Sequence, residues 1–285
     1  MAVKNIMGVT VGNKLNKVCG AAEDTIYSLS SLYAYTNYCI EFDGTDDYVS
    51  FGDLDGTEWH WAATNGLADG VTVSAWINTD VINANEGIFS NDGIGDSTYS
   101  GCWVQLNSSG KPMLQIGNGA NTGSAYRAGR LSNAALSASR WYHIVFVFTD
   151  ADRANWRIYV DASAHTLADS GTYSGSVGYE AGTAPAGTGA KQQHYFNGKM
   201  CHIAVWTTAL DANTVTSLYN SGKPNNLKSA TSYVNNGGSN MSGKLFHWMR
   251  FDEGTGTAAT QETENEDVSE GTLTNSPAWV NTGPA

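Results

Sequence analysis

Three aspartates lie within five residues of one another, at positions 43, 46 and 47. Carboxylate oxygens are ligands that Ca²⁺ prefers, and Asp43, Asp46 and Asp47 could supply several of them from one turn. Aspartate and glycine also favour tight turns in the absence of any metal. The spacing therefore predicts a turn and makes Ca²⁺ a candidate ligand. Asp252 and Glu253 form a second, smaller acidic group near the C-terminus.

Large aromatic side chains in or near predicted loops could stack on the apolar faces of sugar rings. The predicted sugar-binding residues are Trp59, Trp61, Tyr99, Trp103 and Tyr126. Other tryptophans, such as Trp76 and Trp141, lie in predicted strands, where packing in the core is the commoner role. The loop aromatics thus indicate a sugar-binding surface, with packing at the core or its rim as the alternative.

The sequence holds no residue pattern typical of an enzyme. A glycoside hydrolase needs two carboxyl groups about 5–10 Å apart across a cleft, and the apolar strands predicted here carry no acidic pair. His143 and His202 are single histidines within apolar segments, where they usually pack or form hydrogen bonds. Motifs such as G-x-S-x-G, H-E-x-x-H and the P-loop are absent. We therefore expect no catalytic activity.

Composition and charge favour a β protein and exclude several partners. The chain has 32 glycines, 5 prolines and only 15% charged residues, which suits many short strands joined by tight turns. A net charge of −12 would repel nucleic acids and anionic lipid surfaces. No apolar run approaches the roughly 20 residues of a membrane span, so we expect no membrane insertion.

Periodicity places the expected elements. Residues 71–78 alternate between apolar and polar side chains, as a strand does. Residues 141–148 form the most apolar stretch, which predicts a central strand. Residues 161–194 are rich in Gly, Ala, Ser and Thr and are predicted to be a long surface excursion. Asp211 is a good N-cap for one short helix over 211–221. The pattern predicts an all-β, two-sheet antiparallel jelly-roll sandwich.

Five segments in order resemble the laminin-G-like, concanavalin A-like lectin/glucanase family. They are the F-D-G-T-D-D-Y-V stretch within 40–49, V-T-V-S-A-W-I at 71–77, W-Y-H-I-V-F-V-F at 141–148, W-R-I-Y-V at 156–160, and the element from Phe196 to Leu210. The resemblance covers about residues 38–222 and implies the sandwich fold. Glucanases of this family carry a triplet close to E-x-D-x-x-E on a central strand, and no such triplet occurs here.

The sequence departs from the family pattern at two places, and each affects which family features can be expected here. Cys201 and His202 stand where the family's closing element usually has an acidic pair, so any role of that pair is in doubt. Residues 248–256 resemble a segment that normally precedes the first strand. We therefore expect a C-terminal extension, residues 225–285, to return an edge strand to the sandwich of residues 38–224. The edge of a neighbouring subunit is the alternative.

The flanking segments lead to the functional prediction. Residues 1–37 are predicted to be an N-terminal arm with a weak repeat at 5–9 and 16–21, for attachment or oligomer contact. Residues 1–22 lack the apolar centre of a signal peptide, so we expect synthesis in a cytoplasm without export. An arm ahead of a sandwich is similar to the arrangement in structural proteins of tailed bacteriophages.

The leading prediction is a non-catalytic virion protein, either a capsid decoration or a tail-fibre component that presents an adhesive sandwich. Its arm would bind other capsid or tail proteins, in many copies or as a homo-oligomer. The particle would carry it outside the cell after assembly in the host cytoplasm. The alternative is a free, lectin-like carbohydrate-binding module, with or without a Ca²⁺ requirement, which would bind cell-surface glycans.

Overall fold

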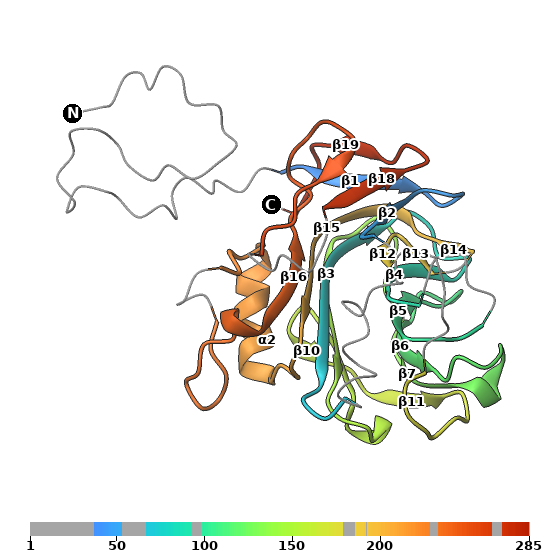
Figure 1. Cartoon of the computed structure of the whole chain (residues 1–285). Coiled ribbons are helices and arrows are strands. Elements are labelled where there is room, and N and C mark those ends of the chain that lie inside the picture. Colours follow the sequence, from blue (N-terminus) through green and yellow to red (C-terminus); the bar gives the residue numbers. More distant parts are fainter. Residues whose placement is uncertain are drawn as a thin grey trace, which may run out of the picture. The chain divides into compact units, whose positions relative to one another are not determined.

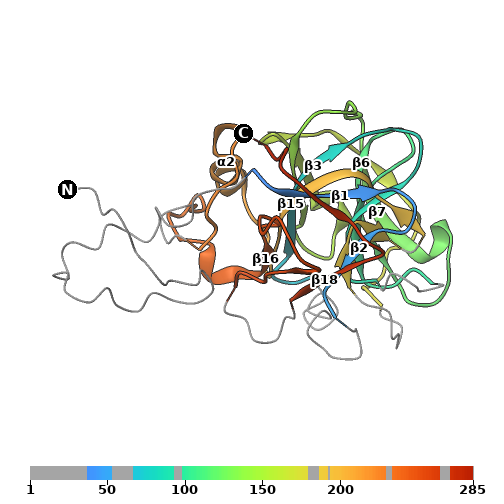
Figure 2. The same ribbon diagram turned by 90° about the horizontal axis from the view of Figure 1, so that it is seen from above.

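The computed structural model describes residues 37–52, 67–92, 98–178, 186–191, 193–228, 233–263 and 270–284. Two antiparallel sheets pack against each other (Figure 1), and helix α2 lies on the far side of the first sheet from the second (Figure 1 and Figure 2). The predicted two-sheet sandwich with one short helix is confirmed. The predicted N-terminal arm lies outside the described residues, apart from Asn37. No helix in the described ranges has the length and apolar character to cross a membrane.

The first sheet has eight strands among the described residues, in the order β10-β9-β8-β3-β15-β1-β19, with β16 also paired to β15. The predicted central strand, β8, lies between β3 and β9. The strands are β1 (Cys39–Asp43), β3 (Val71–Thr79), β8 (Tyr142–Phe148), β9 (Arg157–Val160), β10 (Ser163–Ala164), β15 (Asn197–Trp206), β16 (Leu245–Met249) and β19 (Ala278–Val280).

The second sheet has nine strands in the described part of the chain, in the order β11-β7-β6-β5-β4-β12-β2-β18-β17. These are β2 (Tyr48–Ser50), β4 (Glu86–Ser90), β5 (Cys102–Leu106), β6 (Pro112–Gly117), β7 (Arg127–Ser132), β11 (Leu167–Ser170), β12 (Gly187–Thr188), β17 (Ala258–Ala259) and β18 (Gly271–Thr274). Two further strands, β13 (Ala190–Lys191) and β14 (His194–Tyr195), form a separate pair. Short 3-10 helices span Ser124–Tyr126, Arg153–Asn155, Asn220–Gly222 and Ser242–Lys244.

The predicted surface excursion at 161–194 is wrong for several of its residues. Strand β11 pairs with β7 at one edge of the second sheet. Strand β12, only two residues long, lies between β4 and β2 in the interior of that sheet. Gly187 and Thr188 are both buried, and the Thr188 hydroxyl donates to the carbonyl of Ile88. Their small side chains carry no apolar period, so the sequence shows no strand signal there.

Apolar side chains bury both faces of the first sheet. The cluster between the sheets contains Val73 and Phe146, and a second cluster outside the first sheet contains Val145 and Trp206. In the outer cluster the Trp206 indole donates to the Tyr233 hydroxyl at 3.1 Å. Strand β3 is therefore buried on both faces. Strands covered on both sides are commonly apolar along most of their length, as β8 is.

Helix α2 (Ala212–Tyr219) supplies part of the outer cover, and it lies where the sequence predicted a helix. The Asp211 carboxylate accepts from the backbone N–H of Thr214 at 2.9 Å, which satisfies one of the free donors at the helix start. Val215 and Leu218 face the first sheet and join the outer cluster. The helix ends at Asn220, whose φ of 47° is left-handed.

The C-terminal extension contributes strands to both sheets. Strand β16 pairs with residues 203–206 of β15, while β1 pairs with residues 197–200 on the same side of that strand. A register shift between Cys201 and Ala204 separates the two stretches, and His202 there has a φ of 50°. Strand β19 pairs with β1, and β18 pairs with β2. The backbone N–H of Gly283 donates to the carbonyl of Asn37 at 2.7 Å.

A buried carboxyl group at the base of the β3–β4 connection makes stability depend on pH. Glu86 is 2% exposed, and its Oε2 accepts from the Thr79 hydroxyl at 2.9 Å. Burial raises the pKa of Glu86 to about 7 from 4.5. Between these values the folded state holds a proton that the unfolded state releases, so the free energy of unfolding should fall as pH rises from 4.5 to 7.

The substitution Glu86→Gln should flatten this dependence, because glutamine keeps the size of the side chain and has no proton to lose. Urea unfolding of both proteins at pH 5 and pH 7.5 measures it. Other groups titrate in both proteins, so the difference between the two pH slopes isolates Glu86. Equal slopes would show that Glu86 does not hold the extra proton.

Candidate functional site

A cleft of about 280 Å³ opens on the outer face of the second sheet, over β5, β6, β7 and β11. We call it the outer-face cleft. Its described lining residues are Tyr99, Trp103, Asn85, Gln105, Asn107, Gln115, Ser108, Ser170, Met113, Leu131, His194 and Arg127. They combine aromatic, amide, hydroxyl and guanidinium groups, so the cleft offers one stacking surface and many hydrogen-bonding atoms.

Strand alternation turns these side chains outward. On β5, Val104 packs in the core between the sheets, so Trp103 and Gln105 on either side of it point the other way. On β6, Leu114 packs in the same core and Gln115 faces the cleft. The apolar residues of each strand thus fix the direction of the polar ones.

The floor of the cleft is held by hydrogen bonds between neighbouring strands. Trp103 and Gln115 are directly opposite in the register of β5 and β6, and the indole Nε1 donates to the glutamine Oε1 at 3.0 Å. The Nε2 of Gln115 donates to the Ser170 hydroxyl of β11 at 3.4 Å. Gly129 lies between them, where an added Cβ would stand 2.7 Å from Gln115 Cγ. A glycine at this position therefore allows the bridge from β6 to β11.

Tyr99 and Arg127 stand beside this floor and are only partly buried. The rings of Tyr99 and Trp103 have centroids 5.4 Å apart and planes tilted by 35°. The Cζ of Arg127 lies 5.8 Å from the centroid of the Tyr99 ring, within the range of a cation–π contact. Arg127 Nη1 donates to Ser170 Oγ at 3.3 Å. One aromatic ring and one cation therefore border the same polar floor.

The predicted sugar-binding aromatics fall into three groups. Tyr99 and Trp103 both line the outer-face cleft. Trp103 was predicted in or near a loop; it lies within β5, is 2% exposed and packs against the Tyr99 ring. Tyr126 ends a 3-10 helix and is not among the lining residues. Trp59 and Trp61 lie outside the described residues.

Sequence reasoning missed Arg127 and the amides of Gln105 and Gln115. A signal was present, since each glutamine interrupts a short apolar strand at an alternate position. An isolated glutamine does not reveal its neighbours, however. Only the pairing of β5 with β6, and of β6 with β7, brings these residues to one cleft.

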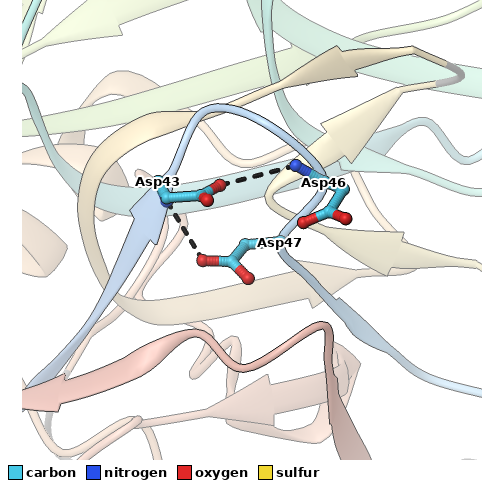
Figure 3. A group of neighbouring side chains, drawn as sticks. All are labelled: Asp43, Asp46 and Asp47. Carbon is cyan, nitrogen blue, oxygen red and sulfur yellow. Dashed lines mark hydrogen bonds between the residues drawn. The ribbon is translucent and has the colours of Figure 1, made fainter.

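The three aspartates of the predicted metal group do converge. Figure 3 shows the carboxylates of Asp43, Asp46 and Asp47 around the turn between β1 and β2, and one oxygen of each lies within 4.8 Å of the others. Asp43 Oδ1 accepts from the backbone N–H of Thr45 at 2.7 Å, and Asp47 Oδ2 accepts from the N–H of Asp43 at 3.1 Å. These bonds also stabilise the turn by themselves.

The donor set is compatible with a hard cation. Asp46 uses neither carboxylate oxygen in a hydrogen bond to the described residues, and Asp43 and Asp47 each keep one oxygen free of such bonds. Burial raises the pKa of Asp47; the N–H of Asp43 opposes this, and the charges of Asp43 and Asp46 add to it. A bound cation would favour the ionised form of all three, and Ca²⁺ accepts such carboxylate oxygens.

The second acidic group has structural contacts. Asp252 forms an ion pair with Arg250, and Glu253 accepts from the backbone N–H of Thr260 at 2.5 Å. Burial raises the pKa of Asp252 to about 6, against the lowering effect of Arg250. These contacts hold the turn that follows β16.

The two strand histidines are packed, as expected. His143 Nε2 lies 2.9 Å from Ser74 Oγ, and its ring packs beside those of Trp76 and Tyr219, with centroids 5.0 and 6.1 Å away. Burial lowers the pKa of His143 to about 3, so the ring is neutral near pH 7. His202 is also buried, with its ring centroid 5.9 Å from that of Trp248.

Comparisons with known proteins bear on the fold. Among solved structures, a proposed carbohydrate-binding protein from Bacteroides ovatus aligns with 88% of this chain at 16% identity and a TM-score of 0.55, and the chain spans 62% of that protein's length. A CBM40 module of a Ruminococcus gnavus sialidase, bound to α2,3-sialyllactose, aligns over 63% of this chain and 95% of its own at 16% identity and a TM-score of 0.45.

A pentraxin from Limulus polyphemus aligns over 65% of this chain and 82% of its own, at 17% identity and a TM-score of 0.42. The comparison with curated proteins gave no match. The model of the concanavalin A-like lectin/glucanases superfamily matches residues 43–216, close to the range of the resemblance in the sequence. Because this match covers more than half of the chain, the protein belongs to the concanavalin A-like lectin/glucanase superfamily.

Proposed function

We propose that the protein is a non-catalytic carbohydrate-binding domain and that the outer-face cleft is its binding site. The observation that carries the proposal is the convergence of the Tyr99 ring with the amides of Gln105 and Asn107 in one cleft. A sugar presents an apolar face of C–H groups and a rim of hydroxyls. An aromatic ring and side-chain amides, which both donate and accept hydrogen bonds, match these two parts.

The cleft is also fixed before a ligand arrives. The bridge from Trp103 through Gln115 to Ser170 holds three strands in register, so little side-chain ordering remains to oppose binding. A sandwich of this fold in a proposed carbohydrate-binding protein agrees with the proposal.

Catalysis finds no support in the cleft. None of its described lining residues carries a carboxyl group, whereas glycoside hydrolysis generally uses two. Sugar binding without turnover is the activity that these side chains favour.

The virion assignment stays a prediction. It rests on the N-terminal arm and on the order of segments in the sequence, and the arm lies outside the described residues. Attachment to capsid or tail proteins, the oligomeric state and the cellular location therefore remain expectations from the sequence.

Binding can be tested with a glycan array, followed by calorimetry on the glycan that gives the strongest signal. The substitution Tyr99→Ala should weaken binding about tenfold, or ~1.4 kcal/mol, because it removes the stacking surface. Tyr126→Ala is the matched control: it removes a tyrosine of similar exposure that does not line the cleft, and it should leave the affinity unchanged.

An array without signal for the folded protein would contradict the proposal. A loss of affinity in Tyr126→Ala equal to that in Tyr99→Ala would instead move the binding site away from the cleft.

We further propose that Asp43, Asp46 and Asp47 bind Ca²⁺, and that the ion stabilises the turn between β1 and β2. At a Ca²⁺ concentration 100 times the dissociation constant, folding should gain about 2.7 kcal/mol. Asp46→Asn should reduce this gain without breaking a hydrogen bond, since that carboxylate accepts none from the described residues.

Thermal unfolding in millimolar Ca²⁺ and in EDTA measures the gain, with the exposed Asp69→Asn as a matched control of charge. A melting temperature that is the same in both solutions would refute Ca²⁺ binding. That result would leave the proposal for the cleft intact.

A further inference from the structure

The arginines of this chain fall into those that form an ion pair with a described aspartate and those that do not. Four of the six are paired with a described aspartate: Arg130 and Arg153 with Asp169, Arg140 with Asp161, and Arg250 with Asp252. Arg157 has no such pair but is exposed to solvent. Arg127 alone is both partly buried and without an ion pair to the described residues.

The hydrogen bonds of Arg127 leave much of its guanidinium unused. Nη1 donates to a neutral partner, the hydroxyl of Ser170. Nε is buried and has no hydrogen bond to the described chain, and Nη2 has none either. A guanidinium that is partly removed from water gains most from an anionic partner, because opposite charges attract more strongly where water is partly excluded and a carboxylate can accept two parallel hydrogen bonds from the guanidinium.

The described residues around Arg127 offer no anionic partner. The described residues that line the cleft carry aromatic, amide, hydroxyl, imidazole and thioether groups, and none is a carboxylate. This differs from the protein as a whole, whose net charge is −12. At physiological salt the screening length is about 8 Å, so distant surface carboxylates act weakly in the cleft and the local cation dominates.

We infer that the outer-face cleft prefers sugars that carry a carboxylate, such as uronic or sialic acids, and that Arg127 binds this group. The inference rests on the proposed function. In it the carboxylate pairs with the guanidinium of Arg127, while the ring of the same or the adjacent sugar lies against Tyr99. The amides of Gln105 and Asn107 are left for hydroxyl groups, since the Gln115 amide is already bonded to Trp103 and Ser170.

Pairs of glycans that differ only in charge test this preference. An array of sialylated and uronic-acid oligosaccharides, each printed as the free acid beside its methyl ester, supplies them. 3′-Sialyllactose and trigalacturonic acid are the two probes for calorimetry, each against its ester. At least one free acid should bind tenfold or more tightly than its ester, which differs by one methyl group and has no charge.

Substitutions at Arg127 test whether this residue causes the preference for acidic sugars. Arg127→Gln should lose about tenfold in affinity for the free acid and should bind acid and ester equally. Arg127→Lys keeps the charge but not the planar fork, so it should retain part of the preference. Arg157→Gln is the matched control, since it removes an unpaired arginine from the other sheet. Tyr99→Ala should weaken acid and ester alike.

The outcomes separate this inference from the proposed function. Tight binding of neutral glycans, or of esters as well as acids, would overturn the acidic preference while leaving sugar binding in place. If no glycan binds, both the acidic preference and the proposed sugar binding would be overturned. If Arg127→Gln shows no thermal unfolding transition and is therefore unfolded, the native protein and Arg127→Lys can still be compared. Their relative affinities for acid and ester then test the preference.

Discussion

The sandwich depends on how the backbone of β15 is paired. This ten-residue strand lies beside β3 along one edge, but no single strand covers its other edge. Strand β1 pairs with its first part and β16 with its last, and a register shift lies between them. Buried backbone groups must be paired. Segments from both ends of the described chain are therefore needed to complete the first sheet.

Completion of that sheet also determines what lies on its outer side. Strand β16 brings Trp248 into the outer cluster, beside Trp206 and the helix residue Leu218. The first sheet then packs apolar side chains on both of its faces. The second sheet has its apolar residues on the inner face, and its outer face carries the polar side chains of the cleft. The two sheets differ because α2 and the C-terminal extension cover the outer face of the first sheet and leave the cleft on the outer face of the second sheet open.

Sequence patterns predicted the elements with a clear local signal. The apolar run of β8, the N-cap of α2 and the acidic turn after β1 could all be located from residue types alone. The two-residue strand β12 could not, because Gly187 and Thr188 carry no period and their place is set by pairing with β4 and β2.

The cleft was predictable only in part, for a related reason. Tyr99 and Trp103 stand out by residue type. Residue type alone does not show that Tyr99 is partly exposed at the side of the cleft while Trp103 is buried beneath it. The contributions of Gln115 and Arg127 depend on cross-strand register, which joins Trp103 to Gln115 and Gln115 to Gly129. Tyr126 precedes β7 by one residue, so the alternation that directs Arg127 into the cleft does not extend to it.

The hydrogen bond between Asn37 and Gly283 has a mechanical consequence. Strands β1 and β19 are antiparallel, and Cys39 is opposite Val280, so the two ends of the described domain leave from the same end of this strand pair. A force that pulls these ends apart would load the hydrogen bonds between β1 and β19 one after another, as in a zip, rather than all together in shear. The domain would yield first at this seam, while the strands that carry the cleft lie in the other sheet and outside the path of the load.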